Sequence, residues 1–327
     1  MSRNLKHFVL VLLLLGFAGR AVPAELLRLE SSVEAMGSTY SVVLYGPDRE
    51  QLEAAAELAF AEARRLDEEL SNYKPESPWS QVNRYAAERP VPVPAELFDL
   101  LSACLNYSRQ SEGAFDITVG PLMRVWGFYK GSGHLPKPGE VKASLEHVGY
   151  RNILLDPKTH TVRFAKPGVE MDPGGIGKGF AVDRMADALK QAGITIGLVS
   201  GSGSSIYAIG APPGEKGWTI SIRNPHDEAK TVQDIVLKDE SLSTSGSYEK
   251  FFEADGRIYA HIMDPRTGFP ARGMLSVSII TPRTIDSEAW CKPFFINGRA
   301  WAAQHKPEKA RAYFCEDKAN QQCVWLQ

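Results

Sequence analysis

The chain has 327 residues, of which 43% are hydrophobic and 23% are charged, and its formal net charge is -2 at pH 7. A chain of this size can bury a sizeable core, and its length fits one large domain or two smaller ones. No basic block stands out, so the charge pattern excludes the electrostatic footprint of a nucleic-acid-binding protein, and an acidic ligand would need a local positive site.

The first segment, MSRNLKHFVLVLLLLGFAGRAVPA, has the pattern of a secretory signal peptide. Two basic residues precede an apolar run over 8–18, and small residues follow at Val22 and Ala24. The apolar run is too short for a comfortable transmembrane span. We therefore expect a signal peptide over 1–24, a mature domain over 25–327 and a periplasmic location. Membrane attachment is expected only if the signal stays uncleaved, because no cysteine near the cut could carry a lipid.

The N-terminal half of the mature chain predicts one strand and two helices. A strand-like stretch covers 39–46, and apolar residues then recur at helical spacing up to residue 70, where Asp48 and Gln51 suit the helix N-terminus. A polar loop, SNYKPESPWSQVN, precedes a second helix near 94–111. The segment that follows, WGFYKGSGHLPKPGEV, is rich in glycine and proline, and we expect a looser structure there.

The C-terminal half predicts more strands than helices. Short strands at 152–155 and 161–164 lead to a helix over 179–192, and a strand at 194–199 follows. In that helix Val182, Met185 and Leu189 would face inward. A final helix over 287–295 precedes a terminal hairpin. No linker clearly separates two domains, so the pattern predicts an α+β fold with helices packed on mostly antiparallel sheets. The β-rich segments between these elements are WTISIRN, DIVLKD, SLSTSGS, RIYAHIM and LSVSIIT.

The four cysteines match no metal-binding spacing and no CxxC motif. Cys315 and Cys323 bracket a turn between two strand-like ends, so in an oxidising compartment this pair is spaced to close a hairpin disulfide. Cys104 lies within the second helical pattern, where we expect a small buried hydrophobic residue and not a reactive thiol.

A glycine-rich turn, MDPGGIGKGF, opens the helix over 179–192. Its spacing matches neither a Walker loop nor the dinucleotide motif GxGxxG. Backbone amides freed by the glycines, the positive end of the helix and the charge of Lys178 nonetheless favour an anion. The alternative is a tight strand-to-helix turn with a solvated lysine, and these residues alone leave both interpretations open.

Five blocks of the sequence, in order, resemble the FAD:protein FMN transferases of the ApbE family. Asp172, Gly174, Lys178, Gly179 and Asp183 match the family pattern within the glycine turn. The resemblance runs from residue 36 to residue 298. The other four blocks are AMGSTYSVVL, EGAFDITVGPLMRVWGF, STSGSYEKFF and YAHIMDPRTGFPA.

This resemblance implies a fold, a ligand and a reaction. The fold would be a single ApbE-type domain, which is T-fold-like. FAD would be the substrate, held in a cleft with Mg²⁺ at its diphosphate. FMN would then pass from FAD to a Ser or Thr hydroxyl of a partner flavoprotein, with release of AMP.

The resemblance also implies roles for single residues. Lys178 would neutralise the diphosphate, and His261 is the candidate base for the incoming hydroxyl, because imidazole titrates in a suitable range. Gly175, through its carbonyl, and Glu288 would bind the metal. Purely structural roles are the alternatives to ligand binding: surface packing for Tyr73, core packing for Phe115 and a β-turn over 264–268. The remaining residues expected at FAD are Met36, Tyr73, Ala114, Phe115, Asp116, Asp172 and Ile262.

The chain departs from the family pattern at its presumed metal site. In SEAWCKPFFING, Glu288 stands for an aspartate and Lys292 for a threonine, and we expect Pro293 to interrupt the helix. Ser205 replaces another aspartate. The Lys292 ammonium either takes over part of the metal's charge or forms a surface salt bridge in a protein that has lost its metal. The alternatives to a transferase are therefore an FAD-binding protein without transfer activity and an FAD pyrophosphatase.

Overall fold

The computed structural model describes residues 26–131, 133–318 and 322–326. The predicted signal peptide, 1–24, lies outside the described residues, so its cleavage and the periplasmic location stay predictions. Among the helices that are described, none is both long and apolar enough to cross a membrane.

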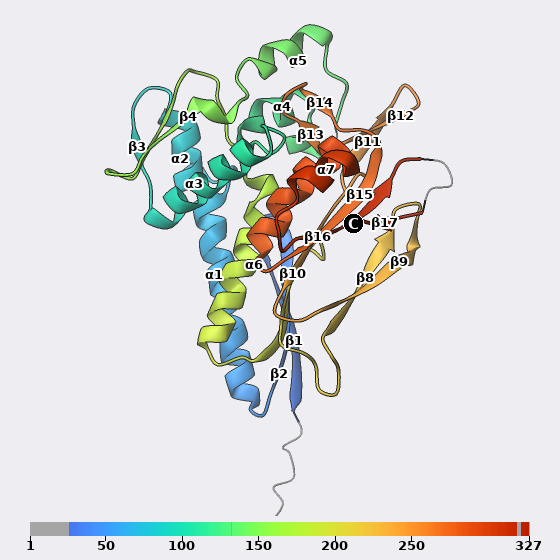
Figure 1. The fold of residues 1–327 in the computed structure, drawn as a ribbon. Helices are drawn as coiled ribbons and strands as arrows, with labels where there is room; N and C mark the ends of the chain where they lie inside the picture. The colour runs from blue at the N-terminus through green and yellow to red at the C-terminus, as the bar shows by residue number, and fades with distance from the viewer. Residues whose placement is uncertain (1–25, 132, 319–321, 327) are drawn as a thin grey trace, which may run out of the picture.

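An eight-stranded sheet forms the framework of the molecule, and every neighbouring pair in it is antiparallel (Figure 1). In order across the sheet the strands are β1 (Leu27–Ala35), β2 (Ser38–Gly46), β6 (Ile196–Gly201), β7 (Ser205–Ile209), β10 (Ser241–Gly246), β15 (Met274–Thr281), β16 (Arg311–Glu316) and β17 (Val324–Trp325). Successive side chains of β2 point to opposite faces. Tyr40, Val42 and Leu44 are fully buried in the main core, whereas Val43 and Tyr45 pack against a smaller cluster on the other face.

Three long helices, α1 (Arg49–Leu70), α6 (Gly177–Gln191) and α7 (Thr284–His305), cover one face of this sheet (Figure 1). As predicted, Asp48 caps α1 by accepting a hydrogen bond from the amide of Gln51 at 3.1 Å. The residues predicted to face inward from α6, Val182, Met185 and Leu189, are fully buried. This layer of helices on an antiparallel sheet confirms the predicted α+β class.

Helix α7 corrects the prediction that Pro293 interrupts it. The helix extends well beyond the predicted range of 287–295, and its backbone leaves helical geometry only at Gly298, where φ is 77°. Pro293 removes one backbone donor. The proline ring is nevertheless buried, and the adjacent Phe294 and Phe295 lie in the main core. Packing of this apolar stretch against the sheet therefore outweighs the local preference of proline.

A hairpin covers part of the opposite face of the sheet. It consists of β8 (Trp218–Asn224) and β9 (Asp227–Leu237), whose apolar side chains join the smaller cluster with β7, β10 and β15. The predicted terminal hairpin is confirmed as β16 and β17. The predicted disulfide between Cys315 and Cys323 is present, with the two Cα atoms 4.3 Å apart, and Cys104 is fully buried, as expected.

The remaining helices form a cap at one end of the three-helix layer and the sheet (Figure 1). The prediction of a polar loop over 71–83 is wrong for its second half, because 78–85 form a helix. Ser77 accepts a hydrogen bond from the amide of Ser80, Pro78 begins the helix, and the buried Trp79 donates its Nε1–H to the carbonyl of Met171 at 3.1 Å. The helices of the cap are α2 (Pro78–Tyr85), α3 (Ala95–Gln110), η1 (Ile117–Val119), α4 (Gly120–Val125), η2 (Phe128–Lys130), α5 (Pro138–Leu145), η3 (Tyr150–Asn152) and η4 (Pro173–Gly175).

Small strands complete this region. A three-stranded sheet pairs β3 (Val91–Pro92), β5 (Thr161–Phe164) and β4 (Ile153–Asp156), and two hairpins pair β11 (Phe251–Ala254) with β12 (Arg257–Ala260) and β13 (Met263–Asp264) with β14 (Phe269–Pro270). The described parts of the segment predicted to be looser, 126–131 and 133–141, contain η2 and the start of α5, so they have more regular structure than their glycine and proline content suggests.

Candidate functional site

A cavity of about 350 Å³ opens between the cap and the layer of long helices. This volume lies within the range of small-molecule binding sites. Its lining comes from segments that are far apart in the chain, and it includes every residue that the resemblance places at the ligand or the metal. These are Met36, Tyr73, Ala114, Phe115, Asp116, Asp172, Gly175, Lys178, His261, Ile262 and Glu288.

The glycine turn forms one wall of the cavity. Asp172 begins η4 and accepts a hydrogen bond from the amide of Gly174 at 2.8 Å, while its other oxygen lies 3.3 Å from Nδ2 of Asn72. Burial raises the pKa of the Asp172 carboxyl above its ordinary value. The carboxylate thus fixes the turn that presents Gly174 and Gly175 to the cavity.

Gly179 lets the start of α6 approach α7 closely. A Cβ atom at this position would lie 2.6 Å from the carbonyl oxygen of Thr284 and 2.8 Å from Oε2 of Glu288, so no larger residue fits. The amide of Gly179 donates a hydrogen bond to Oε2 of Glu288, whose side chain is buried. The glycine turn and the glutamate of α7 therefore form one unit.

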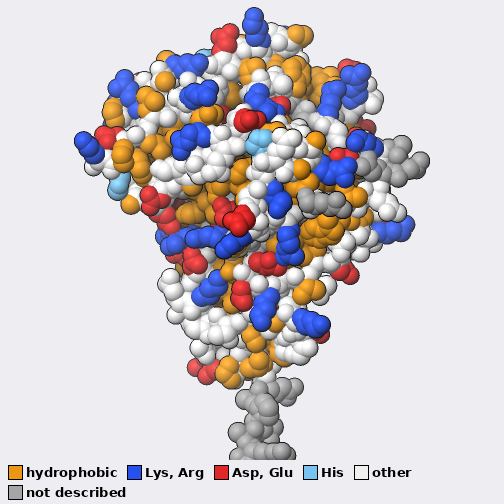
Figure 2. All heavy atoms as spheres, in the orientation of Figure 1, with side chains coloured by type: hydrophobic (Ala, Val, Ile, Leu, Met, Phe, Trp, Pro, Cys, Tyr) orange, Lys and Arg blue, Asp and Glu red, His pale blue; other side chains and the backbone are white. Residues whose placement is uncertain are grey.

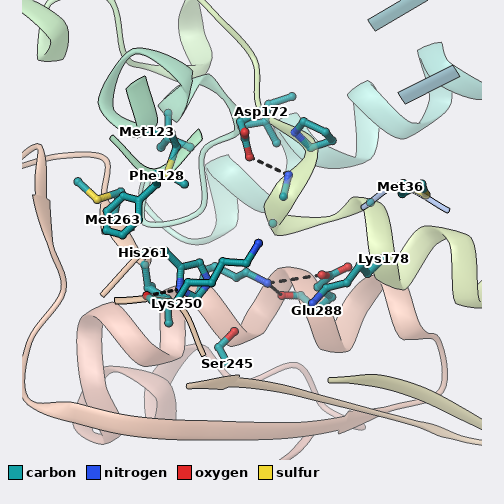
Figure 3. A pocket seen from close by; sticks show the side chains of 18 of the residues that line it. Met36, Met123, Phe128, Asp172, Lys178, Ser245, Lys250, His261, Met263 and Glu288 are labelled. Atoms are coloured by element: carbon teal, nitrogen blue, oxygen red, sulfur yellow. Dashed lines mark hydrogen bonds and ion pairs between the residues drawn. The ribbon is translucent and has the colours of Figure 1, made fainter. Parts of the chain in front are cut away.

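Three lysines line the same cavity, and Figure 3 shows two of them, Lys178 and Lys250. Lys178 donates from Nζ to Oγ of Ser204 at 2.6 Å. Lys292 donates from Nζ to the backbone carbonyl of Glu288 at 3.2 Å and lies 3.8 Å from its Oε1. Lys250 was not selected from the sequence, although it stands in the quoted block STSGSYEKFF. Together they supply the local positive charge that an acidic ligand would need in this chain.

His261 is neutral at pH 7. Burial, reinforced by the charges of Lys292, Lys250 and Lys178, lowers its pKa to about 4. Its Nδ1 lies 3.1 Å from the carbonyl oxygen of Lys250, and because a carbonyl can only accept, Nδ1 carries the proton. The lone pair is consequently on Nε2, so the ring has the form that a general base requires, but its pKa lies below the ordinary imidazole range expected from the sequence, which makes it a weaker base.

Three other residues predicted at the ligand contact mainly other parts of the chain. Asp116 accepts from the amide and the hydroxyl of Thr118, at 2.8 and 2.6 Å, and from the amide of Tyr150 at 2.6 Å, so it organises its own loop. Phe115 is 2% exposed and packs in the main core as well as lining the cavity. Tyr73 is 75% exposed at the rim, where its ring meets that of Tyr129 edge-on.

Sequence reasoning missed an apolar wall of the cavity. Met123, Phe128 and Met263 line one region and belong to, or pack against, a separate hydrophobic cluster (Figure 3). All three stand within the blocks that resemble the ApbE family, but single apolar residues give no signal that distinguishes a ligand wall from a core.

The departure at Ser205 leaves a buried hydroxyl in place of a carboxylate. Ser205 is 1% exposed, and Ser243 donates to its Oγ at 3.4 Å. Ser243 also shares a hydrogen bond of 2.8 Å with Ser287. The position is satisfied within the chain and adds no negative charge to the cavity.

The residues predicted to bind Mg²⁺ do not fit that ion. Mg²⁺ takes octahedral oxygen ligands and is usually held by one or two free carboxylates together with waters and substrate phosphates. Within the described parts of the chain, no group of three or more acidic, histidine or cysteine side chains could hold a metal. Of the Glu288 oxygens, one accepts from the amide of Gly179 and the other faces the ammonium of Lys292. A protonated lysine cannot be a metal ligand.

Amides at a glycine turn, three lysines and a neutral histidine in one cavity define a protein that binds an anionic small molecule. The model of the ApbE family matches residues 36–314. The chain belongs to the ApbE family.

Relatives and solved structures agree with this assignment. The FAD:protein FMN transferase of Klebsiella pneumoniae (strain 342) is 31% identical over 86% of this chain and 87% of its own length. That of Treponema pallidum is 32% identical over 89% and 84%. The crystal structure of the ApbE protein from Thermotoga maritima superposes with a TM-score of 0.81 at 30% identity, covering 89% of this chain and 95% of that one. The apo form of the Pseudomonas stutzeri flavinyl transferase ApbE gives 0.78 at 28% identity over 92% and 94%.

Proposed function

We propose that this chain is an FAD:protein FMN transferase that acts on a Ser or Thr hydroxyl of a partner flavoprotein outside the cytoplasm. The observation that carries the proposal is the placement of a neutral imidazole, His261, in the same cavity as the glycine turn and Lys178. The names of the curated relatives support the reaction, and the N-terminal signal pattern supports the location.

The proposed step is a displacement at phosphorus. The acceptor hydroxyl oxygen forms a bond to the phosphorus of the FMN half of FAD, and its proton moves to Nε2 of His261. The bond from that phosphorus to the bridging oxygen breaks, and AMP leaves with the electron pair. Charge builds on the phosphate oxygens, where the turn amides and Lys178 stabilise it.

The proposal also assigns each part of FAD to a part of the cavity. The diphosphate would lie at the glycine turn and Lys178, because helix N-termini and backbone amides bind such anions. The apolar wall of Met123, Phe128 and Met263 would suit a flat ring system. Tyr73, at the rim, is placed to cover a bound ring.

The test is incubation with FAD and an unmodified flavoprotein whose flavinylated threonine is known, with AMP and acceptor mass as the readouts. AMP formation that requires the acceptor, together with an acceptor mass gain equal to FMN, supports transfer. AMP in the absence of the acceptor would identify a pyrophosphatase instead. Bound FAD without AMP in either arm would identify a binding protein.

The pH dependence of kcat/KM should reflect the lowered pKa of His261. Only the neutral imidazole acts as a base, so activity is present above this pKa and is lost as the pH falls through it. We expect the half-maximal rate at about pH 4 and nearly constant rates between about pH 5 and 7. A profile that falls near pH 6.5, the ordinary value for histidine, would show that His261 is not held neutral in this way.

A further inference from the structure

Helix α7 places an ammonium group beside a buried carboxylate at the wall of the cavity. Lys292 and Glu288 stand one helical turn apart, with Nζ and Oε1 separated by 3.8 Å. The side chain of Lys292 is 21% exposed and that of Glu288 only 3%. A second contact, from Nζ to the backbone carbonyl of Glu288 at 3.2 Å, holds the ammonium in place.

This lysine lies between the two residues for which the resemblance implies metal binding. A Cβ atom on Gly175 would be 3.6 Å from Cε of Lys292, so the end of the lysine side chain lies against the glycine turn. On its other side is Glu288, whose remaining oxygen accepts from the amide of Gly179. A divalent cation here would have to displace one ammonium and compete with one backbone donor.

We infer that Lys292 takes the place of a divalent cation in this chain, so that FAD binding does not depend on Mg²⁺. The inference rests on the proposed function, because it assumes that the ligand's diphosphate lies at the glycine turn. Lys178 supplies a second ammonium at that turn, and Lys250 a third at the same cavity. The ammonium of a lysine is a compact positive charge that binds phosphate oxygens well. It cannot contact the same carboxylate as Mg²⁺, because the two cations repel each other.

The state of His261 agrees with this arrangement of lysines. After burial, the charges of Lys292, Lys250 and Lys178 all lower the pKa of its imidazole. The three ammonium groups therefore act on the same side chain of the cavity before any ligand is present.

Calorimetric titration of the wild-type protein with FAD, in EDTA and in Mg²⁺, tests the inference. We expect affinities that agree within about twofold, since no step of binding recruits the ion. An affinity that falls tenfold or more in EDTA would overturn the inference while leaving the proposed function intact. Absence of FAD binding in both buffers would overturn both.

A Lys292→Met variant tests the lysine itself, because methionine keeps the length of the apolar part of the side chain and the helix propensity but removes the ammonium group. In EDTA we expect FAD affinity to fall about tenfold or more, the size of a lost charge-assisted hydrogen bond. Lys190→Met is the matched control: this lysine of α6 contacts the Tyr207 hydroxyl at 2.8 Å, outside the cavity, and its loss should leave FAD affinity unchanged. Wild-type affinity in Lys292→Met would overturn the inference. Thermal unfolding of each variant checks that it is folded. If a variant does not fold, the titration of the wild-type protein in EDTA and Mg²⁺ still tests the inference.

Discussion

Replacement of His261 by alanine is expected to lower the rate of FMN transfer by about 10²- to 10⁴-fold, the usual contribution of a general base. FAD affinity should change little, because the diphosphate is expected to bind at the glycine turn and Lys178, whereas Nδ1 of His261 bonds to the carbonyl of Lys250. The measurement is single-turnover transfer to an acceptor protein at saturating FAD, with FAD affinity determined separately by calorimetry.

His147→Ala provides the control for this variant. His147 also places Nδ1 near a backbone carbonyl, that of Pro167 at 2.9 Å, but it does not line the cavity. Its rate should stay within about twofold of the wild type, because surface substitutions away from a site have small effects. If His261→Ala retained the wild-type rate with FAD bound, another group would have to accept the proton.

Replacement of Asp183 by alanine should lower the free energy of unfolding by about 2–4 kcal/mol, because one buried and one partly buried backbone donor would lose their partner. The N-cap residue of α7, Arg283, makes no side-chain capping bond. Asp183 of α6 supplies it instead, accepting from the amides of Thr284 at 2.7 Å and Ile285 at 3.0 Å, and its side chain is 3% exposed. Urea denaturation gives the change directly.

Asp187→Ala is the matched control on the same helix, one turn further along. Asp187 is 38% exposed and lies 3.8 Å from Nη2 of Arg283 and 3.9 Å from Nη1 of Arg184, so it has two ion pairs but accepts no backbone hydrogen bond among those described. Exposed pairs of this kind contribute at most about 1 kcal/mol. Equal losses of stability in the two variants would contradict the capping role of Asp183.

Much of the fold could be predicted from the sequence, because helix caps, apolar spacing and cysteine spacing each depend only on residues close together in the chain. Asp48 and the apolar spacing after it define α1, and Cys315 and Cys323 flank a turn short enough for a disulfide. Helix α2 was missed because it is short and polar and shows only Ser77 and Pro78 as start signals. Continuation through Pro293 was missed because burial of the residues after it, Phe294 and Phe295, depends on the whole sheet.

The site shows the same limit. The resemblance selected residues that all line one cavity, but it could not predict how they pair. Glu288 accepts from Gly179, which lies 109 positions earlier in the chain, so no local pattern reports that contact. The position of Lys292 between Gly175 and Glu288, and the neutral state of His261, likewise depend on distant segments. The substitutions at 288 and 292 already questioned the metal, and the geometry adds that both oxygens of Glu288 have partners within the chain.

A crystal structure of the wild-type protein soaked with FAD would test the proposed binding mode most directly. The diphosphate should lie within hydrogen-bonding distance of Nζ of Lys178 and of the amides of the glycine turn, with the phosphorus of the FMN half facing His261. Phosphates found outside this cavity, or a flavin ring occupying the glycine turn, would contradict it.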